Sequence, residues 1–368
     1  MKEGWEYRKF DDALEKVKYT RKLQTNEFLP KGTFPIISQE EEFISGYWNN
    51  KEDLFKVNKP IVIFGDHSRV LKYIDFDFVL GADGVKILEP IDTINAKFLY
   101  HFLKWFNVPN MGYSRHYKFL KEINLPIPPL KEQILIVDEL DLLSGIIEKE
   151  NAQLEELDKL AQSIFYDMFG DPVTNEKGWE MADLNSACDV RDGTHDSPKY
   201  LPKSDYLLVT SKNIQDDCID FTTANFISHE DYDNINKRSF VDDGDIIMAM
   251  IGTIGKPIIV RKQGYKFCVK NVALIKFNSD SKVLNIFIKS LLNNKSYMHY
   301  LKSFNKGGTQ KFVALGTIRS LRIPIPPLSL QQEFADKISA IEAMKAKVRQ
   351  SLKEAEQLFN SRMDYYFN

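Results

Sequence analysis

The sequence has few cysteines and no long apolar run, and we expect no signal peptide. Its three cysteines, Cys188, Cys218 and Cys268, are far apart, which argues against a disulfide framework and a CxxC metal site. We expect all three to be small buried residues. No segment reaches the roughly 18 consecutive apolar residues of a membrane span, and the N-terminal MKEGWEYRKF lacks an apolar core. We therefore expect a cytoplasmic protein.

Catalytic motifs are also missing. The sequence contains no Walker A motif, no HExxH, no Asn/Asp-Pro-Pro-Tyr/Phe of an amino-methyltransferase and no convincing acidic nuclease cluster. Residues 252–255, GTIG, lack the spacing of a phosphate-binding loop, and Pro257 follows Lys256, so we interpret them as a turn between two strands. His195 is interpreted as a loop residue because no second His lies at a ligand spacing. We expect no metal site, no cofactor bound by this chain and no catalysis by it.

Length and composition are those of a globular protein with more than one core. The chain has 368 residues and a mass of 42.7 kDa, with 43% apolar and 27% charged residues, which fits two to three domains. The net charge of −3 argues against a protein that binds nucleic acid over its whole surface.

An internal repeat is the strongest feature of the sequence. NLPIPPLKEQ at residues 124–133 returns as RIPIPPLSLQ at residues 322–331, and GWE at residues 4–6 returns at 178–180. FPIISQ at 34–39 similarly resembles YLLVTSK at 206–212. An offset of 198 residues, without a gap, aligns further pairs: Pro126 with Pro324, Gln133 with Gln331, Leu154 with Leu352, Glu156 with Glu354, Leu160 with Leu358, Ser163 with Ser361 and Phe169 with Phe367. The order is head, helix, head, helix.

The proline phrases predict stiff joints. Each Pro fixes its own φ and disfavours helix in the residue before it, so each phrase should be extended and lead into the helix that follows. The PxxP spacing also invites interpretation as a ligand of a proline-binding module, but the repetition favours a joint.

The two long segments that follow the joints predict helices with a coiled-coil seam. The first should run from Leu130 to about Phe169, where Gly170 stops it. Steps of four and three residues define the pairing seam in both helices: Ile136, Leu140, Leu143, Ile147, Glu150 and Leu154 in the first, and Ile338, Ile341, Lys345, Val348 and Leu352 in the second.

An antiparallel arrangement with level centres would pair the acidic residue of the first seam with a basic residue of the second. In that register Glu150 lies opposite Lys345, and three apolar pairs flank them: Ile147 with Val348, Leu154 with Ile341, and Leu143 with Leu352. Other registers also bury apolar residues, and a stalk for oligomerisation is the alternative interpretation of these helices.

We therefore expect an α+β protein with two mixed α/β heads, separated by two long helices that pack as an antiparallel coiled coil with pseudo-twofold symmetry. The expected division is 1–123, the first head; 124–170, the first joint and long helix; 171–321, the second head; and 322–368, the second joint and long helix. Outside the long helices, Lys and Arg exceed Asp and Glu by four residues, a balance compatible with phosphate contacts.

Polar and aromatic residues gather just before each proline joint, in GYSRHYK at residues 112–118 and KGGTQK at 306–311. Arg, Lys and Gln can read base edges, and Ser, Thr and Tyr suit phosphates. Either cluster could be an ordinary solvated loop, but its recurrence at the same place in both heads favours a binding role.

The motifs, in their order along nearly the whole chain, resemble the specificity (S) subunits of type I restriction-modification systems. They are GWE at the start of each head, the PIPPL-xxQ joints, GDHSRVLKYIDFDF, GADGVKIL and GYSRHYKFLKEI in the first head, and DGTHDSPKY, GDIIMAMIGTIGKP and GGTQKF in the second.

The resemblance implies that each head is a target recognition domain that reads one half of a split, asymmetric DNA site, while the helices fix the spacing and bind partners. It implies double-stranded DNA, two methylation (M) subunits and restriction (R) subunits as partners, with S-adenosylmethionine, ATP and Mg on those subunits. Candidate DNA contacts, by analogy with the family, are Arg69, Lys72, Tyr113, Arg115, His116, Lys118, Thr194, Lys212, Thr309, Gln310 and Lys311.

Two other functions remain open at this point. The same architecture could serve a methylation-only or type II-like system, which the neighbouring genes would reveal. Alternatively, the chain could be a coiled-coil scaffold with two protein-binding heads. The small excess of positive charge in the heads is modest evidence against this alternative.

Overall fold

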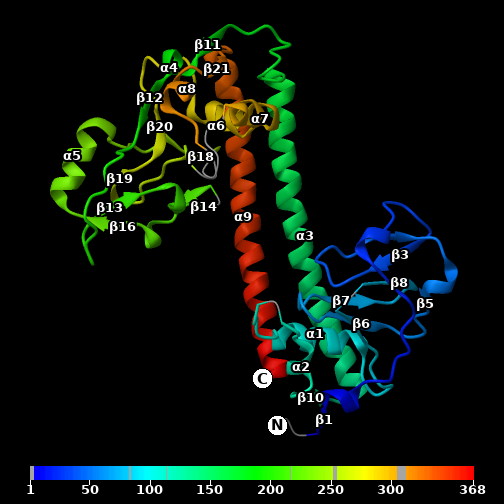
Figure 1. Cartoon of the computed structure of the whole chain (residues 1–368). Coiled ribbons are helices and arrows are strands. Elements are labelled where there is room, and N and C mark those ends of the chain that lie inside the picture. The colour runs from blue at the N-terminus through cyan, green and yellow to red at the C-terminus, as the bar shows by residue number, and fades with distance from the viewer. Residues whose placement is uncertain (1–3, 83, 113, 216, 252–254, 305–311) are drawn as a thin grey trace. The chain divides into compact units, whose positions relative to one another are not determined.

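The computed structural model places helices and strands in a repeated order (Figure 1). It describes residues 4–82, 84–112, 114–215, 217–251, 255–304 and 312–368. The chain divides into two compact units, residues 1–152 with 349–368 and residues 153–348. Each unit holds one mixed α/β head together with part of each long helix.

The long helices are α3, Leu130–Phe169, and α9, Leu328–Phe367, and they lie beside each other (Figure 1). Both begin directly after the second Pro of the Pro-Pro pair, where a missing N–H costs little. α3 ends before Gly170, which takes a φ of +75°, the left-handed conformation typical of the residue after a helix. The predicted positions of both helices are confirmed.

The helices pack antiparallel, as predicted. In the first unit, Arg362 of α9 donates from Nη2 to Glu139 of α3 at 2.9 Å. In the second unit, the rings of Phe165 of α3 and Phe334 of α9 lie 5.7 Å apart. The early part of α3 therefore contacts the late part of α9, and the late part of α3 contacts the early part of α9.

The predicted register of this pair is wrong. Lys345 Nζ donates to Asp158 at 2.7 Å and to Glu342 at 3.0 Å, and the Glu150 carboxylate accepts from the Ser351 hydroxyl. The helices are shifted by about one heptad from the register that set Glu150 opposite Lys345. A shift of one heptad keeps every seam residue in the seam, so the apolar pattern alone cannot distinguish the two registers.

The first head contains a sheet of order β2-β8-β3-β4, in which β5 also pairs with β8, a sheet of order β7-β6-β9 and the pair β1-β10. Its strands are β1 Glu6–Lys9, β2 Lys22–Leu23, β3 Phe34–Ile37, β4 Gly46–Trp48, β5 Leu54–Phe55, β6 Ile61–Gly65, β7 Leu71–Ile74, β8 Phe78–Gly81, β9 Val85–Leu88 and β10 Asn124–Ile127. Its helices are η1 Phe10–Ala13, η2 Thr25–Glu27, η3 Lys51–Asp53, α1 Ala96–Phe106 and α2 Tyr117–Leu120.

The second head contains a sheet of order β12-β20-β17-β18, a sheet of order β16-β13-β19 and the pair β14-β15. Its strands are β11 Met181–Asp183, β12 Asp189–Asp192, β13 Tyr206–Val209, β14 Ile214–Gln215, β15 Cys218–Ile219, β16 Asn225–Ile227, β17 Ile246–Ala249, β18 Gly255–Ile259, β19 Lys266–Val269, β20 Val272–Lys276 and β21 Arg322–Pro324. Its helices are α4 Leu184–Ala187, η4 Ser211–Asn213, η5 Phe221–Thr223, α5 His229–Ser239, α6 Asn285–Asn293, α7 Lys295–Ser303 and α8 Leu315–Arg319.

The two heads share one scaffold. β3 is parallel to β8, and β13 is parallel to β19. β6 lies antiparallel between β7 and β9, and β17 lies antiparallel between β18 and β20. The heads differ just before these central strands, because the helix α5 precedes β17 whereas the short strand β5 precedes β6. The sequence repeat is therefore a structural repeat inside the heads as well.

Each proline joint is extended, as predicted, and pairs with the strand that follows the GWE motif. β10 is antiparallel to β1, and β21 is antiparallel to β11. The joint is fixed to its head by a glutamine that is 0% exposed, Gln133 in the first unit and Gln331 in the second.

The two glutamines make the same three hydrogen bonds. Gln133 Oε1 accepts from the Asn95 N–H at 2.7 Å, and Nε2 donates to the carbonyls of Thr93 and Pro128 at 2.9 and 2.8 Å. Each amide thus joins the loop before α1 or α6 to the proline joint. The repeated Gln of the PIPPL-xxQ phrase is explained by this clamp.

Gln331 repeats the arrangement in the second unit. Its Oε1 accepts from the Leu284 N–H at 2.8 Å, and its Nε2 donates to the carbonyls of Lys282 and Pro326 at 3.1 and 2.8 Å. A buried amide with all these partners fixes the angle between joint and head because each bond is directional.

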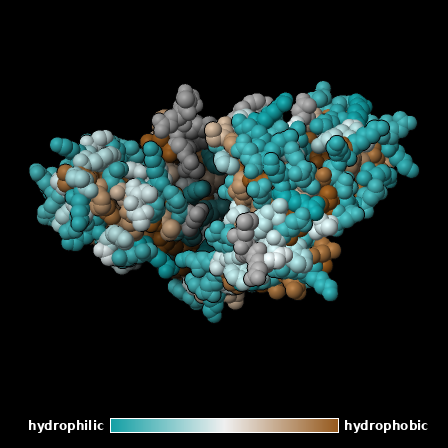
Figure 2. All heavy atoms as spheres, turned by 90° about the horizontal axis from the view of Figure 1, so that it is seen from below, coloured by the Kyte–Doolittle hydropathy of each residue, from teal (hydrophilic) through white to brown (hydrophobic). Residues whose placement is uncertain are grey.

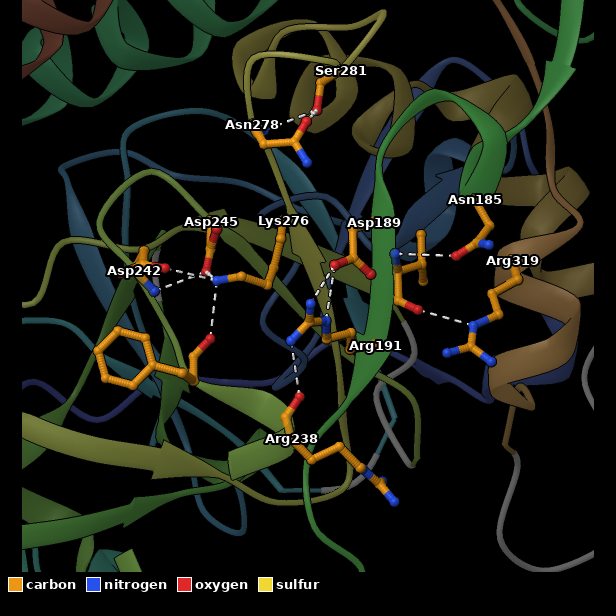
Figure 3. A network of polar contacts seen from close by, with 12 residues as sticks. Asn185, Asp189, Arg191, Arg238, Asp242, Asp245, Lys276, Asn278, Ser281 and Arg319 are labelled. Carbon is orange, nitrogen blue, oxygen red and sulfur yellow. Dashed lines mark hydrogen bonds and ion pairs between the residues drawn. The ribbon is translucent and has the colours of Figure 1, made fainter. Parts of the chain in front are cut away.

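A polar network supports the four-stranded sheet of the second head (Figure 3). Lys276 Nζ donates to Asp242, Asp245 and the Phe240 carbonyl at 2.9, 2.7 and 2.9 Å. Asp245 is 3% exposed, and its burial raises the pKa of its carboxyl. The network connects β20 with the segment after α5, so we interpret it as part of the scaffold.

The cysteine prediction is partly confirmed. Cys188 and Cys268 are buried and free, and burial raises the pKa of each thiol to about 12, which makes them unreactive. Cys218 is exposed, contrary to prediction, and is the first residue of β15 in the short β14-β15 pair.

Hydrophilic residues cover most of the face of the molecule seen from below (Figure 2). Among the residues that the structure describes, no helix is long and apolar enough to cross a membrane.

Candidate nucleic-acid interface

In the first head, strand ends and turns meet at one edge. Gly65 at the end of β6 pairs with Val85 at the start of β9. The Asp66 N–H donates to the Gly84 carbonyl at 2.7 Å, which joins the turn after β6 to the turn before β9. We call this set of loops the first edge: residues 38–45, 66–70, 84, 108–112 and 114–118.

Gln39 connects the end of β3 to the same turn. Its Oε1 accepts from the His67 N–H at 3.2 Å, and its carbonyl accepts from the Ser68 hydroxyl at 2.5 Å. Gly84 has a φ of +89°, and a Cβ there would lie 2.4 Å from this Oε1, so any other residue would strain the backbone and displace the Gln39 amide. The loops of the first edge are therefore packed closely against one another.

The segment before the first proline joint packs against this turn. The N–H groups of His116 and Tyr117 donate to the carbonyl and to Oδ1 of Asp66, both at 2.8 Å. Arg69 donates from Nη1 to the Val108 carbonyl at 3.0 Å. The structure thus brings the polar segment at 112–118 beside the β6–β7 turn, a proximity that spacing in the sequence did not show.

The residues predicted in the first head fall into two groups. Arg115 and Lys118 are exposed and Arg69 is half-buried, all on the first edge. Lys72 and His116 are only 3% and 0% exposed. Tyr113 lies outside the described residues.

Lys72 is a correction to the predicted site. Its Nζ donates to the carbonyls of Ser38 and Glu42 at 3.0 and 2.5 Å and lies 3.4 Å from the carbonyl of Phe43, and burial lowers the pKa of its amine. Because side chains alternate along a strand, Lys72 shares the buried face of β7 with Ile74. Its charge holds the loop after β3 and has no accessible group for DNA.

His116 is the second correction. Its Nδ1 lies 3.0 Å from the Asp66 carbonyl oxygen, and its Nε2 accepts from the Met111 N–H at 3.2 Å. The imidazole therefore links the backbone at Met111 to the β6–β7 turn at Asp66. The sequence placed a histidine in a polar run but gave no sign of its depth.

In the second head, the equivalent strand ends form a second edge. Val209 at the end of β13 pairs with Val269 at the end of β19, and Ala249 at the end of β17 pairs with Val272 at the start of β20. We call the second edge residues 192–197, 210–213, 238, 256 and 270–271, which follow or precede these ends.

The loop after β12 lies directly on this edge. The Thr194 N–H donates to the Val269 carbonyl at 2.9 Å, and a Cβ at Gly193 would lie 2.3 Å from that same oxygen, which explains the glycine. Thr194, a predicted contact, is 9% exposed, and its Oγ1 accepts from the Asp196 N–H at 3.1 Å. We interpret Thr194 as a residue that shapes the loop.

His195 lies at the centre of a charged cluster that the sequence did not predict. Its Nε2 is 2.9 Å from Asp192 Oδ2, and its Nδ1 is 2.8 Å from Asn271 Oδ1. Arg238, at the end of α5, donates from Nη2 to Asp192 Oδ1 at 2.6 Å. Hydrogen bonds to Asn271 and Asp192 raise the pKa of His195, because both acceptors favour the doubly protonated ring.

The remaining predicted residues of the second head lie near the same edge or outside the described part. Lys212 is exposed in η4, directly after β13. Thr309, Gln310 and Lys311 lie outside the described residues. The residue after them, Phe312, pairs with Ile251, and the Val313 N–H donates to the Met250 carbonyl at 3.0 Å. The chain before the second joint thus meets the end of β17, as its counterpart meets the end of β6.

The two edges present exposed basic and amide groups on closely packed loops. Such groups can donate to phosphate oxygens and base edges, and a rigid scaffold under them fixes their positions. In the described part of the chain, no three His, Cys, Asp or Glu residues are grouped so as to hold a metal ion. The direct contact of any single residue with DNA stays a prediction.

Comparison with known proteins relates the chain to one family. A family model described as type I restriction modification DNA specificity domain matches residues 2–159 and 176–357, one match for each head with most of its long helix. The type I restriction enzyme MjaVIII specificity subunit of Methanocaldococcus jannaschii is 21% identical over 97% of this chain and 89% of its own. The EcoBI specificity subunit of Escherichia coli is 22% identical over 84% of this chain and 71% of its own.

Solved structures agree on the fold. The S subunit of the type I restriction-modification system from M. genitalium has a TM-score of 0.61 at 15% identity, with 98% of this chain and 95% of that chain covered. A chain from a study of complex assembly in the type I restriction-modification system has a TM-score of 0.51 at 15% identity, covering 100% and 98%.

Proposed function

The chain belongs to the type I restriction modification DNA specificity family, and we propose that it reads a bipartite, asymmetric site in double-stranded DNA, one half with each head. The observation that carries this proposal is the repeated edge. The same strand ends meet in both heads, but they present different side chains, such as Arg115 in the first and His195 in the second. Two heads with the same strand arrangement but different side chains on their edges suit two related but different half-sites.

The long helices would keep the half-sites at a constant separation. Forty helical residues correspond to a rod of about 60 Å. Two heads on such a rod meet the same face of DNA only at a defined number of base pairs, so bases between the half-sites would go unread.

Partner subunits would supply the chemistry. We infer that the chain itself is not catalytic and directs two M subunits, which carry S-adenosylmethionine, and R subunits, which use ATP and Mg, to the site. The support is the naming of the relatives as specificity subunits.

Sequencing of methylated adenines in host DNA, with and without this gene, tests the proposal. The expected result is loss of methylation at one bipartite sequence. An unchanged methylome would contradict it.

Exchange of one head tests whether each edge reads its own half-site. Replacing residues 4–123 with the head of a relative should change one half of the methylated sequence only, and a change in both halves would contradict reading by separate heads.

A further inference from the structure

Two equivalent hairpins each hold a basic residue in a left-handed backbone conformation. Arg69, two residues before β7, has a φ of +65°, and Lys256, the second residue of β18, has a φ of +55°. Asn and Asp tolerate this region because their short side chains bond locally, but Arg and Lys do not. Of the other described non-glycine residues with positive φ, only Gln263 is neither Asn nor Asp.

The conformation of Lys256 is unusual for a second reason. It precedes Pro257, and residues before proline normally adopt extended backbone. Gly255 before it has a φ of +95°, and its missing Cβ leaves room for Met298, whose Cε would lie 2.6 Å from such an atom. Gly255 and Pro257 are buried, whereas Lys256 is exposed. The fold therefore presents this one side chain to solvent from a strained position between two anchored residues.

The charges of Arg69 and Lys256 are not neutralised by the protein. Within the described residues, neither forms an ion pair with a carboxylate, and Arg69 gives one guanidinium N–H to the Val108 carbonyl. By contrast, Arg238 on the second edge is paired with Asp192 at 2.6 Å. Lys256 is exposed and Arg69 is half-buried, both have a strained backbone, and in the described part of the chain no carboxylate offsets either charge. The fold does not account for these two charges, which points to a ligand of negative charge.

Both residues lie beside the segment that precedes a proline joint. The Arg69 turn receives the N–H groups of His116 and Tyr117 through Asp66, and the end of β17 opposite Lys256 receives the Val313 N–H. The two basic groups therefore lie on equivalent hairpins of the two heads, Arg69 in the turn before β7 and Lys256 near the start of β18.

We propose that Lys256 binds a DNA phosphate in the second head and that Arg69 is its counterpart in the first. The inference rests on the proposed function and deepens it by assigning a contact to each edge. Side chains that read bases must differ between heads that read different half-sites, whereas phosphates are the same in every sequence. A basic residue on the same hairpin of two otherwise different edges thus fits a phosphate, and the point charge of Lys suits it.

The test is the salt dependence of DNA binding by the full chain in complex with its methylation subunit. The probes are a short duplex that carries the bipartite sequence found in the host methylome and a duplex of unrelated sequence. Removal of one phosphate-binding cation should reduce the magnitude of the slope of log K against log salt concentration by about 0.9. We expect this reduction, with weaker binding to both duplexes, for Lys256→Gln and for Arg69→Gln, while Lys256→Arg keeps the slope.

Lys266→Gln is the matched control. Lys266 is exposed at the start of β19, whereas the second edge lies at the other end of that strand. The substitution removes the same charge from the same head, and we expect the slope of log K against log salt concentration to stay unchanged. An equal reduction in the control would overturn the assignment to this hairpin.

Lys256→Gly separates a DNA contact from a structural role. Glycine adopts the φ of +55° freely, so the melting temperature should not fall while DNA binding weakens as in Lys256→Gln. A slope that stays unchanged in Lys256→Gln would overturn the proposal, as would a weakening confined to one base pair of the second half-site, which would show base reading. If the unaltered complex shows no preference for the bipartite duplex, the proposed function itself fails.

Discussion

The two heads have the same strands but different means of arranging their edges. In the first head, a buried lysine and a buried histidine, Lys72 and His116, hold the loops from inside. In the second head, an exposed cluster around His195 holds the loops at the surface. The repeat thus preserves the pairing of the strands, because backbone hydrogen bonds do not depend on which apolar side chains the strands carry. The side chains on the loops differ between the heads.

The proline joints show the opposite behaviour, since they keep the same side chain for the same task. Gln133 and Gln331 bond to equivalent groups in both units.

The largest effect that we predict follows from this equivalence of the two glutamines. Gln133→Leu and Gln331→Leu should each destabilise their unit by about 3 kcal/mol, because several buried partners lose their hydrogen bonds.

Chemical denaturation, followed by hydrogen exchange in each unit, measures this destabilisation. Gln332→Leu is the control, because Gln332 is the exposed neighbour of Gln331 and, among the residues that the structure describes, its side chain bonds to Asp336 of its own helix alone. If Gln133→Leu and Gln331→Leu lowered the free energy of unfolding by very different amounts, the two joints would not be equivalent.

Lys72→Met should affect the first head alone and somewhat less strongly. The carbonyls of Ser38 and Glu42 lose their charged donor, which should cost about 2 kcal/mol. Hydrogen exchange should accelerate in residues 39–45 and stay unchanged in the second head. Lys118→Met, which removes an exposed lysine of the same head, should leave the exchange of these residues as it is. An equal acceleration of exchange in both heads would show that Lys72 does not specifically hold the loop after β3.

The pKa shifts of two histidines, one in each unit, should have opposite directions. His101 is buried beside Asp141, and burial lowers its pKa, whereas the pKa of His195 is raised. NMR titration of the imidazole signals should show His195 protonated to higher pH than His101, with His195→Gln removing one signal for assignment.

The stability contributions of the two histidines have opposite pH dependence. That of His195 is present below the ordinary histidine pKa of about 6.5 and is lost as the pH rises through the raised value. For His101, the folded state loses stability as the pH falls below about 6.5 towards its lowered pKa. Equal titration of both rings would show that the cluster around His195 does not persist in solution.

The smallest predicted effect concerns the charged contacts of the long helices. Glu139→Gln should weaken the pairing with Arg362 in the first unit, and Asp158→Asn should weaken the pairing with Lys345 in the second, each by about 0.5 kcal/mol because the groups are partly solvated. Thermal melting at two salt concentrations checks this. Glu148→Gln, which changes an exposed residue of α3, should have no effect, and an equal effect there would show that only net charge matters.

Much of the scaffold could be predicted from residue patterns. The ends of α3 followed from the Pro-Pro pair and Gly170, because both act on the local backbone. The candidates Arg115, Lys118 and Lys212 came from the resemblance to the family, and they are exposed on the two edges. Lys72 and His116 were misplaced because a polar residue type does not disclose burial, and the partners of His195 were missed because Asp192, Asn271 and Arg238 are far apart in the chain.

Residue patterns alone were enough for the duplicated order of the elements, the two extended joints, the two long helices and the family. These features depend on periodicity and on residues that act on their own backbone. The register of the helices, the buried Gln clamps and the depth of each charged residue depend on tertiary packing. A heptad pattern repeats every seven residues and so fits several registers, and the packing of Phe165 and Phe334 with the head core selects one of them.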